Sequence, residues 1–321
     1  MKEIGGYFEL ELPLPDFSQI PEGVMVNSGR HALEYILRSF GGSVRRVWLP
    51  YYTCDVVLQP IKRLGLDYMF YHVNENLELA EYPELTDGDY IIVNNYFGIK
   101  DKYISEMAHR YGERLIVDNA QAWYCKPSHK VNYIYSPRKF FGLPDGGIAI
   151  GTFNYSTTLP KGYSASRCSH LLRRIDEGAA AGYDNFRANS MTLHEEPLTR
   201  MSHLTSRLLA TIDFERVKNK RRLNFEILQE SLVKTNQLII PPINEFACAM
   251  VYPYMTSNPS LRSKLIANKI FVATYWPNVL NWCNPTSMEY RFSEEMIPLP
   301  IDQRYDQKDI KSIIHVINKF I

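Results

Sequence analysis

The chain has 321 residues and a net charge of +1, a balance that gives no reason to expect nucleic acid or an anionic membrane as a partner. No apolar stretch reaches the roughly 18 residues of a membrane span, and the N-terminus lacks the apolar centre of a signal peptide. Five dispersed cysteines without a CxxC pair indicate reduced thiols and argue against a zinc site. We therefore expect a cytoplasmic protein that binds no metal.

Up to about residue 150, short apolar runs alternate with segments whose apolar residues repeat at helical spacing. The pattern predicts strands at 45–50, 66–73, 90–93, 115–117 and 147–151, and helices at 55–64 and 103–111. Strands that alternate with helices typically form a parallel sheet. We therefore expect an α/β fold, with a three-layer, mostly parallel sheet that is covered on both faces.

The second half of the chain predicts a smaller domain. One long helical pattern runs from 203 to 232. We expect a large domain at 1–235, which ends in this helix, and a small α+β domain at 236–321. The elements predicted for the small domain are strands at 247–252 and 270–275 and a final helix at 307–320.

The segment between the two halves is harder to assign. Residues 166–177 have the spacing of a helix. Residues 178–186 begin with a run of glycine and alanine, which predicts a loop or a lid.

A small polar motif opens the first helix. Ser28, Gly29 and Arg30 follow the apolar run 24–26 and precede a helical segment. A helix N-terminus presents free N–H groups and the positive end of the helix dipole, so it binds phosphate well. A serine N-cap with a turn glycine would explain the same residues without any ligand.

A carboxylate follows the strand predicted at 115–117. In open α/β sheets, ligands bind at the carboxyl ends of strands, and Asp118 stands at such an end. A buried carboxylate there needs a cationic partner, which a protonated pyridine ring would provide. Gln121 is close enough to reach a phenolic oxygen on the same ring. The alternative is that Asp118 only caps the next helix.

Lys139 follows Asp118 by 21 residues (139 − 118 = 21) and precedes a glycine-rich turn. Ser136, three residues earlier, is placed to bind a phosphate while the lysine reaches an aldehyde. The aromatic and apolar residues at 140–143 are expected to desolvate the lysine, which would lower its pKa and make it nucleophilic. An aspartate, a lysine and two phosphate-binding motifs are together what pyridoxal phosphate needs: the lysine forms a Schiff base, and the aspartate keeps the pyridine nitrogen protonated.

Aromatic residues follow the strand predicted at 45–50. Tyr52 is the first candidate to stack on the cofactor ring, and Tyr51 is the second. Cys54 is a candidate wall of the ring pocket, although a small buried core cysteine explains it as well.

Taken in order, these motifs resemble the DegT-type pyridoxal phosphate-dependent sugar aminotransferases, which have the aspartate aminotransferase (type I) fold. The segments that carry the resemblance are 27–33, 48–53, 118–121, 136–147, 200–202, 222–224 and 297–300. The resemblance implies an enzyme that takes an amino group from a donor such as glutamate. It also implies a nucleotide-linked keto-sugar acceptor and a homodimer with both active sites at the subunit interface.

The chain departs from the family pattern at three places. Ser136 is closer to the lysine than the corresponding serine usually is, Tyr52 or Cys54 replaces a larger ring-stacking residue, and 163–199 does not match. Two alternatives therefore stay open: a non-catalytic or regulatory pyridoxal phosphate-binding protein, and another reaction of the same cofactor, such as elimination. The retained Lys139 argues against the dehydratases that replace this lysine.

Overall fold

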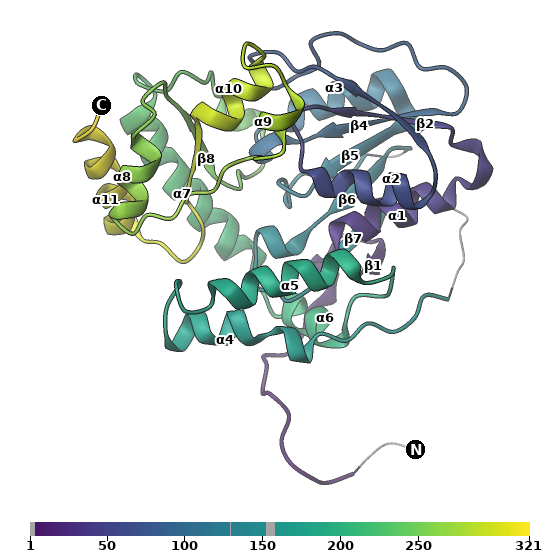
Figure 1. The fold of residues 1–321 in the computed structure, drawn as a ribbon. Coiled ribbons are helices and arrows are strands. Elements are labelled where there is room, and N and C mark those ends of the chain that lie inside the picture. Colours follow the sequence, from purple (N-terminus) through teal and green to yellow (C-terminus); the bar gives the residue numbers. More distant parts are fainter. Residues whose placement is uncertain (1–3, 129, 152–157) are drawn as a thin grey trace.

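The computed structural model describes residues 4–128, 130–151 and 158–321, and its main feature is a seven-stranded sheet flanked by helices (Figure 1). The strands lie in the order β1-β7-β6-β5-β4-β2-β3. All neighbours from β6 to β3 pair in parallel, whereas β7 pairs antiparallel with β6 and with β1. The strands are β1 (Val24–Val26), β2 (Arg46–Pro50), β3 (Asp67–Tyr71), β4 (Asp89–Asn94), β5 (Leu115–Asn119), β6 (Asn132–Tyr135) and β7 (Gly147–Ile150). The predicted α/β class with a mostly parallel sheet is confirmed.

Continuous apolar runs form the middle of the sheet, as burial on both faces requires. Ile91 and Val93 of β4 belong to the core on one face, and Ile92 between them belongs to the core on the other face. The parallel register pairs Asn94 with Asp118 at the ends of β4 and β5. The apolar runs therefore place their polar end residues side by side at the carboxyl edge of the sheet.

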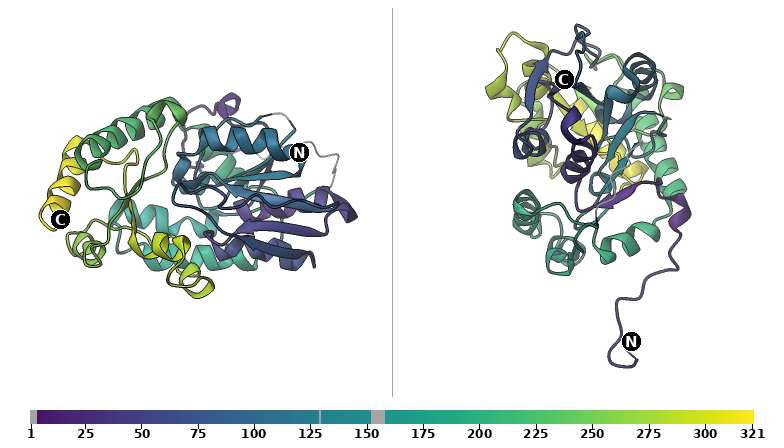
Figure 2. Two further views of the ribbon diagram at one scale, coloured as in Figure 1. Left: turned by 90° about the horizontal axis from the view of Figure 1, so that it is seen from above. Right: turned by 90° about the vertical axis from the view of Figure 1, so that its right-hand side faces the viewer.

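Helices cover both faces of the sheet (Figures 1 and 2). On one face, α1 (Gly29–Ser39) and α2 (Leu58–Arg63) share a core with the strands. On the other face, α3 (Asp101–Tyr111) and α7 (Phe214–Leu232) do the same. This arrangement gives the three layers that the alternating pattern predicts.

The single long helix predicted at 203–232 is wrong, because the structure has two helices there. These are α6 (His203–Ala210) and α7, and a turn at 211–213 separates them. Asp213 is the N-cap of α7, and its side chain accepts a hydrogen bond from Arg216 N at 2.9 Å. An N-cap residue has non-helical backbone angles, so the helix cannot continue through it.

The C-terminal part packs at one end of the sheet (Figure 2). Its strands β8 (Tyr252–Met255) and β9 (Met296–Leu299) pair antiparallel. Its helices are α8 (Leu261–Ala267), α9 (Val279–Trp282), α10 (Met288–Glu295) and α11 (Gln307–Asn318). The predicted final helix corresponds to α11, whereas no strand forms at 270–275 and β8 begins only at the last residue of the strand predicted at 247–252. One apolar core runs through both parts, and the domain boundary at 235 stays a prediction.

Helices α4 (Ser169–Asp176) and α5 (Tyr183–Glu195) form a hairpin below the sheet (Figure 1). The predicted helix at 166–177 corresponds to α4, but the loop predicted at 178–186 is shorter, since α5 begins at Tyr183. The hairpin exposes large apolar side chains at Leu172, Ile175, Tyr183, Phe186 and Met191.

Residues 4–16 form an N-terminal arm that runs out from the body of the molecule (Figures 1 and 2). The arm is tied to the body where Asp16 N donates to Ala210 O at 2.7 Å. Its large apolar side chains lie in solvent, with Tyr7 99% and Phe8 96% exposed. Within the described residues, no helix is both long enough and apolar enough to cross a bilayer.

Candidate active site

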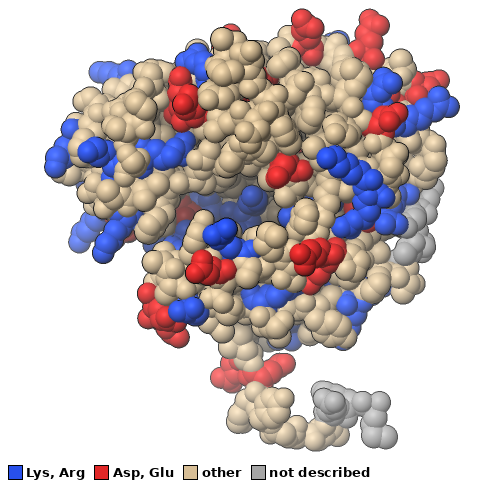
Figure 3. All heavy atoms as spheres, in the orientation of Figure 1, with Lys and Arg blue, Asp and Glu red and all other residues tan. Residues whose placement is uncertain are grey.

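A cavity of about 300 Å³ opens at the carboxyl edge of the sheet. It lies at the floor of a hollow where lysine and arginine side chains gather (Figure 3). Of the residues predicted from sequence to bind the cofactor, those that line it are Ser28, Gly29, Arg30, Asp118, Gln121, Ser136 and Lys139. These side chains come from the start of α1, the end of β5 and the turn after β6, so the fold joins motifs that lie far apart in the sequence.

One end of the cavity is built to hold an anion. The N-terminus of α1 opens into it, and Ser136 lies directly behind Gly29. A Cβ on Gly29 would lie only 3.2 Å from Ser136 Cβ, so a side chain at this position would crowd the cavity wall. Free N–H groups at a helix start attract negative charge.

The Ser28 hydroxyl is already engaged with His31. Its oxygen lies 2.8 Å from His31 Nδ1, and His31 Nε2 lies 3.0 Å from Glu196 O. Burial lowers the pKa of His31 to about 4, so the ring is neutral at pH 7. Since Glu196 O only accepts, the proton sits on Nε2, and Ser28 must donate to Nδ1. The helix N–H groups, rather than this hydroxyl proton, are left for an anion.

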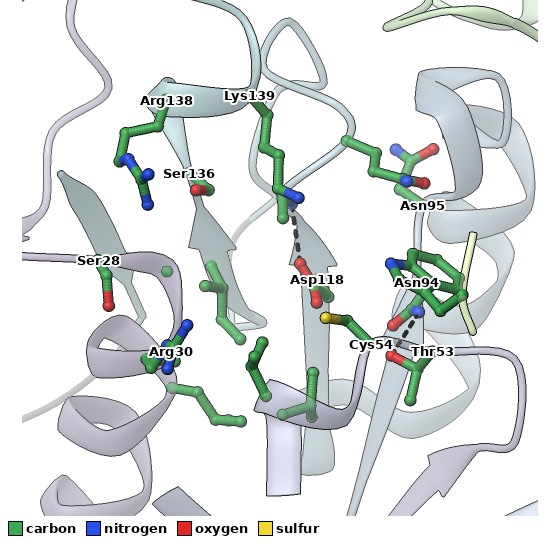
Figure 4. Close-up of a pocket in the computed structure, with 18 of the residues that line it drawn as sticks. Ser28, Arg30, Thr53, Cys54, Asn94, Asn95, Asp118, Ser136, Arg138 and Lys139 are labelled. Carbon is green, nitrogen blue, oxygen red and sulfur yellow. Dashed lines mark hydrogen bonds between the residues drawn. The ribbon is translucent and has the colours of Figure 1, made fainter. Parts of the chain in front are cut away.

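Two arginines face the same end of the cavity (Figure 4). Burial lowers the pKa of Arg138 to about 10, and the positive charge of Arg30 adds to that shift. The buried Nε of Arg138 has no hydrogen-bond partner within the described residues. The negative charge of Asp145 opposes this shift in the pKa of Arg138, but the Asp145 carboxylate pairs with Arg167 at 3.3 Å and accepts a hydrogen bond from Ser202 N at 3.2 Å. Among the described residues, no Asp or Glu oxygen lies within 4.0 Å of Arg30 or Arg138. Two neighbouring cations without an ion-pair partner favour an anion between them.

Asp118 lies in the wall across from this anion-binding end. Its Oδ1 accepts a hydrogen bond from Ala120 N at 2.8 Å. Burial raises the pKa of Asp118, while the Ala120 N–H and the positive charge of Lys139 oppose that shift. No described Lys, Arg or His nitrogen lies within 4.0 Å of its carboxylate. A carboxylate in this state is stabilised by a cationic ligand.

Lys139 points into the cavity above Asp118 (Figure 4). The expectation that its aromatic neighbours desolvate it is wrong, because Lys139 is exposed whereas Phe140 and Phe141 are buried in the core. The short 3₁₀ turn Pro137–Lys139 sends these side chains in opposite directions. The amine is therefore accessible to a small molecule that enters the cavity.

Gln121 presents a free donor to the cavity. Its Oε1 accepts a hydrogen bond from Phe97 N at 2.9 Å. A backbone N–H can only donate, so this bond fixes the orientation of the amide and turns Nε2 away from Phe97. Nε2 is buried without a partner among the described residues. Asn94, also in the wall, donates to Thr53 Oγ1 at 3.1 Å (Figure 4).

Tyr52 is the predicted site residue that the structure contradicts. It is fully buried and does not line the cavity. Its ring packs against Tyr96, Trp276 and Phe292, with centroid distances of 5.0–5.3 Å. The aromatic residues that do line the cavity are Trp276 and Phe186, and Cys54 borders the cavity as well.

Other lining residues were not predicted from sequence. The sequence could have identified Arg138 as a lining residue, since it stands between Ser136 and Lys139 in the same motif. No sequence feature identified the lining residues that come from distant segments, which are Trp276 and, in α5, Phe186 and Ser190. No group of three or more His, Cys, Asp or Glu side chains suited to a metal ion occurs in the described part of the chain.

Neither a protein-family model nor a curated protein matches the sequence. Solved structures match its fold along most of its length. A DegT DnrJ EryC1 StrS aminotransferase from Brucella abortus is 17% identical with a TM-score of 0.63, over 94% of this chain and 86% of that one. The putative sugar aminotransferase Spr1654 from Streptococcus pneumoniae, in its PMP-form, is 13% identical with a TM-score of 0.65, over 95% and 88%.

A third similar structure is the sugar aminotransferase CalS13 from Micromonospora echinospora, which is 13% identical with a TM-score of 0.61, over 92% of this chain and 86% of that one. These likenesses cover nearly the whole chain at low identity, so they establish its fold. The chain has the fold of the DegT-type sugar aminotransferases, as its motifs predicted.

Proposed function

We propose that this protein is a pyridoxal phosphate-dependent aminotransferase. Its substrates are an amino acid donor such as glutamate and a keto-sugar acceptor in nucleotide-linked form. The observation that carries the proposal is the cavity itself, which is lined by a carboxylate (Asp118), an accessible amine (Lys139) and two arginines, and neither this carboxylate nor the arginines have an ion-pair partner among the described residues. The Spr1654 protein, which has the same fold, was solved in both a PLP-form and a PMP-form.

The residues present fit this cofactor group by group. A phosphate matches the start of α1 with Arg30, Arg138 and Ser136. A protonated ring nitrogen matches Asp118, since burial raises the pKa of this carboxyl and no Lys, Arg or His nitrogen lies within 4.0 Å of it in the described part of the chain. A phenolic oxygen matches the free Nε2 of Gln121.

The chain's own residues then have defined roles. When bound, pyridoxal phosphate supplies an electron-withdrawing ring that stabilises negative charge at the substrate carbon. Lys139 Nζ would hold the cofactor and, when free, would move a proton to or from that carbon. The Asp118 carboxylate would stabilise the positive charge at the ring nitrogen. Trp276 and Phe186 line the same cavity and would leave less room for water beside the cofactor.

A donor screen tests this function. The purified protein is mixed with pyridoxal phosphate and dialysed, and single amino acids are then added. We expect one of them to convert the visible absorbance of the bound cofactor to that of its amine form, and keto-sugar nucleotides to reverse the change. If the protein retains the cofactor but no amino acid changes its spectrum, the non-catalytic binding protein becomes the better account.

Arg138 provides a prediction about cofactor retention. Substituting Arg138→Gln removes one of the two cations at the anion-binding end, and we expect cofactor affinity to fall by about tenfold or more. Equilibrium dialysis measures this change. The exposed Arg174→Gln is the control and should bind as the wild type does. Unchanged affinity in Arg138→Gln would place the phosphate elsewhere.

We also propose a homodimer. The N-terminal arm and the α4–α5 hairpin expose large apolar side chains, each worth about 1.5–3 kcal/mol when fully buried. Since α5 also borders the cavity, a partner on the hairpin would lie beside the site. We expect the double substitution Phe8→Asp with Leu10→Asp to convert dimer to monomer in sedimentation experiments, whereas Glu9→Gln with Glu11→Gln should not. A monomeric wild-type protein would contradict the proposal.

A cytoplasmic location belongs to the same proposal. All five cysteines are free thiols, which suits a reducing compartment. Cell fractionation tests this, and recovery of the protein from an oxidising compartment would contradict it.

A further inference from the structure

Arg221 of α7 is a buried arginine without a carboxylate partner. Its side chain is 2% exposed, and no Asp or Glu oxygen of the described residues lies within 4.0 Å of it. Asp302, whose charge acts on Arg221, instead binds Arg304 at 2.7 Å. A buried, unpaired guanidinium is costly, so its retention calls for a role that only a rigid fork of donors can fill.

The fork reaches three neutral acceptors at once. Arg221 donates to Met250 O at 2.8 Å, to Phe140 O at 3.1 Å and to Gln303 Oε1 at 3.1 Å. Its guanidinium carbon also lies 4.6 Å from the centre of the Phe140 ring. These contacts join α7 to three segments that are distant from one another in the sequence.

Two of these acceptors lead directly to the cavity. Phe140 follows Lys139, and its carbonyl accepts a second hydrogen bond, from Gln303 Nε2 at 2.9 Å. Met250 N donates to Phe97 O at 2.7 Å, and Phe97 N donates to Gln121 Oε1 at 2.9 Å. A chain of hydrogen bonds therefore runs from Gln121 in one wall of the cavity, through Arg221, to the turn that carries Lys139.

We propose that Arg221, assisted by Gln303, is a positioning residue that fixes Lys139 relative to Gln121 and Asp118. It acts through the Phe140 carbonyl and does not touch the cavity. The proposal rests on the function proposed above, in that Lys139 is the working amine. A purely structural arginine would change the stability of the fold, whereas a positioning arginine also changes the chemical behaviour of Lys139.

Two variants test the proposal. Arg221→Lys keeps a positive charge but loses the fork. Gln303→Met removes one donor to Phe140 O and also the acceptor of Arg221 Nε, from a half-buried side chain. The matched control is Arg222→Met, since Arg222 lies on the same helix and donates to Ala247 O at 3.2 Å, away from the lysine turn.

The first measurement uses the cofactor-free protein. Lys139 is acetylated with acetic anhydride across a pH series and quantified by mass spectrometry against the exposed Lys308. We expect the relative rate at Lys139 to change by at least about threefold in Arg221→Lys and Gln303→Met, because about one hydrogen bond is lost from the turn. Arg222→Met should match the wild type.

The second measurement adds pyridoxal phosphate. We expect the fraction that borohydride traps on Lys139 to fall by about tenfold in both variants, while the total bound by dialysis changes less than about twofold. If Lys139 is acetylated and trapped in both variants to the same extent as in the wild type, the positioning role is overturned, even if the melting temperatures of the variants fall. A wild-type protein that binds no pyridoxal phosphate would instead refute the proposed function, and the acetylation series would still decide the role of Arg221.

Discussion

Protein carrying Lys139→Ala will not show the absorbance band of a Schiff base between lysine and pyridoxal phosphate, and amino transfer will fall by on the order of 10⁴-fold or more. Alanine offers neither an amine for the covalent bond nor a group that moves the substrate proton. The anion-binding end stays intact in this variant, so dialysis should still detect weaker, non-covalent binding.

Two further variants separate the covalent role of Lys139 from its charge. Lys139→Arg keeps a positive charge near Asp118 but cannot form the bond, so it should also lack the band. Lys126→Ala removes an exposed lysine that does not line the cavity, and it should behave as the wild type does. A purified Lys139→Ala protein that keeps both the band and full turnover would sink the assignment.

The second large effect is expected for Asp118→Asn. The variant should still attach the cofactor through Lys139, but amino transfer should fall by about 10²-fold or more, because a neutral amide does not stabilise a positive ring nitrogen. Borohydride trapping measures attachment, and donor turnover measures the loss.

The same substitution should stabilise the cofactor-free protein at pH 7. Burial raises the pKa of Asp118 above its unfolded value of about 4, so between these two values the folded state binds more protons than the unfolded state. The free energy of unfolding therefore falls as pH rises from the unfolded pKa to the folded pKa of Asp118. At pH values above the folded pKa, the full loss of stability remains. Asparagine removes the penalty.

Thermal unfolding from pH 4 to pH 8, with and without cofactor, checks the sign. Without cofactor, Asp118→Asn should melt above the wild type at pH 7 and lose this advantage toward pH 4. Addition of cofactor should raise the melting temperature of the wild type more than that of Asp118→Asn. The exposed Asp87→Asn is the control. A variant that melts below the wild type at pH 7 and gains equally from cofactor would contradict this account.

The sequence predicts the parts of the site that are local. Ser28 to Arg30 start a helix, Asp118 ends a strand and Lys139 follows a serine in a turn, so each is set by its immediate neighbours. The apolar runs at 90–93 and 115–117 likewise determine the parallel pair that places Asn94 beside Asp118. Local pattern is sufficient here because parallel strands bring their carboxyl ends to one edge.

Predictions from sequence are wrong where the side chains of adjacent residues point in different directions. Phe140 and Phe141 fill the core while Lys139 turns into the cavity, so the predicted desolvation does not occur. Tyr52 suits a stacking role and a core role equally, and only the positions of Tyr96 and Phe292 decide for the core. Trp276 reaches the cavity from a distant segment, which no local pattern reveals. By contrast, the break between α6 and α7 could have been predicted from sequence, because an aspartate such as Asp213 is a typical N-cap residue.

The residues that line the cavity come from two parts of the fold, and this division bears on how the substrate range could be changed. Lys139, Asp118 and the anion-binding end belong to the sheet and its turns, whereas Phe186, Ser190 and Trp276 come from α5 and the C-terminal part. The groups proposed to react and these three lining residues therefore belong to different structural elements. Under the proposed function, a library restricted to Phe186, Ser190 and Trp276 would vary the shape of the cavity wall while Lys139 and Asp118 keep their positions, which would suit this chain to the evolution of activity on new amino-group acceptors.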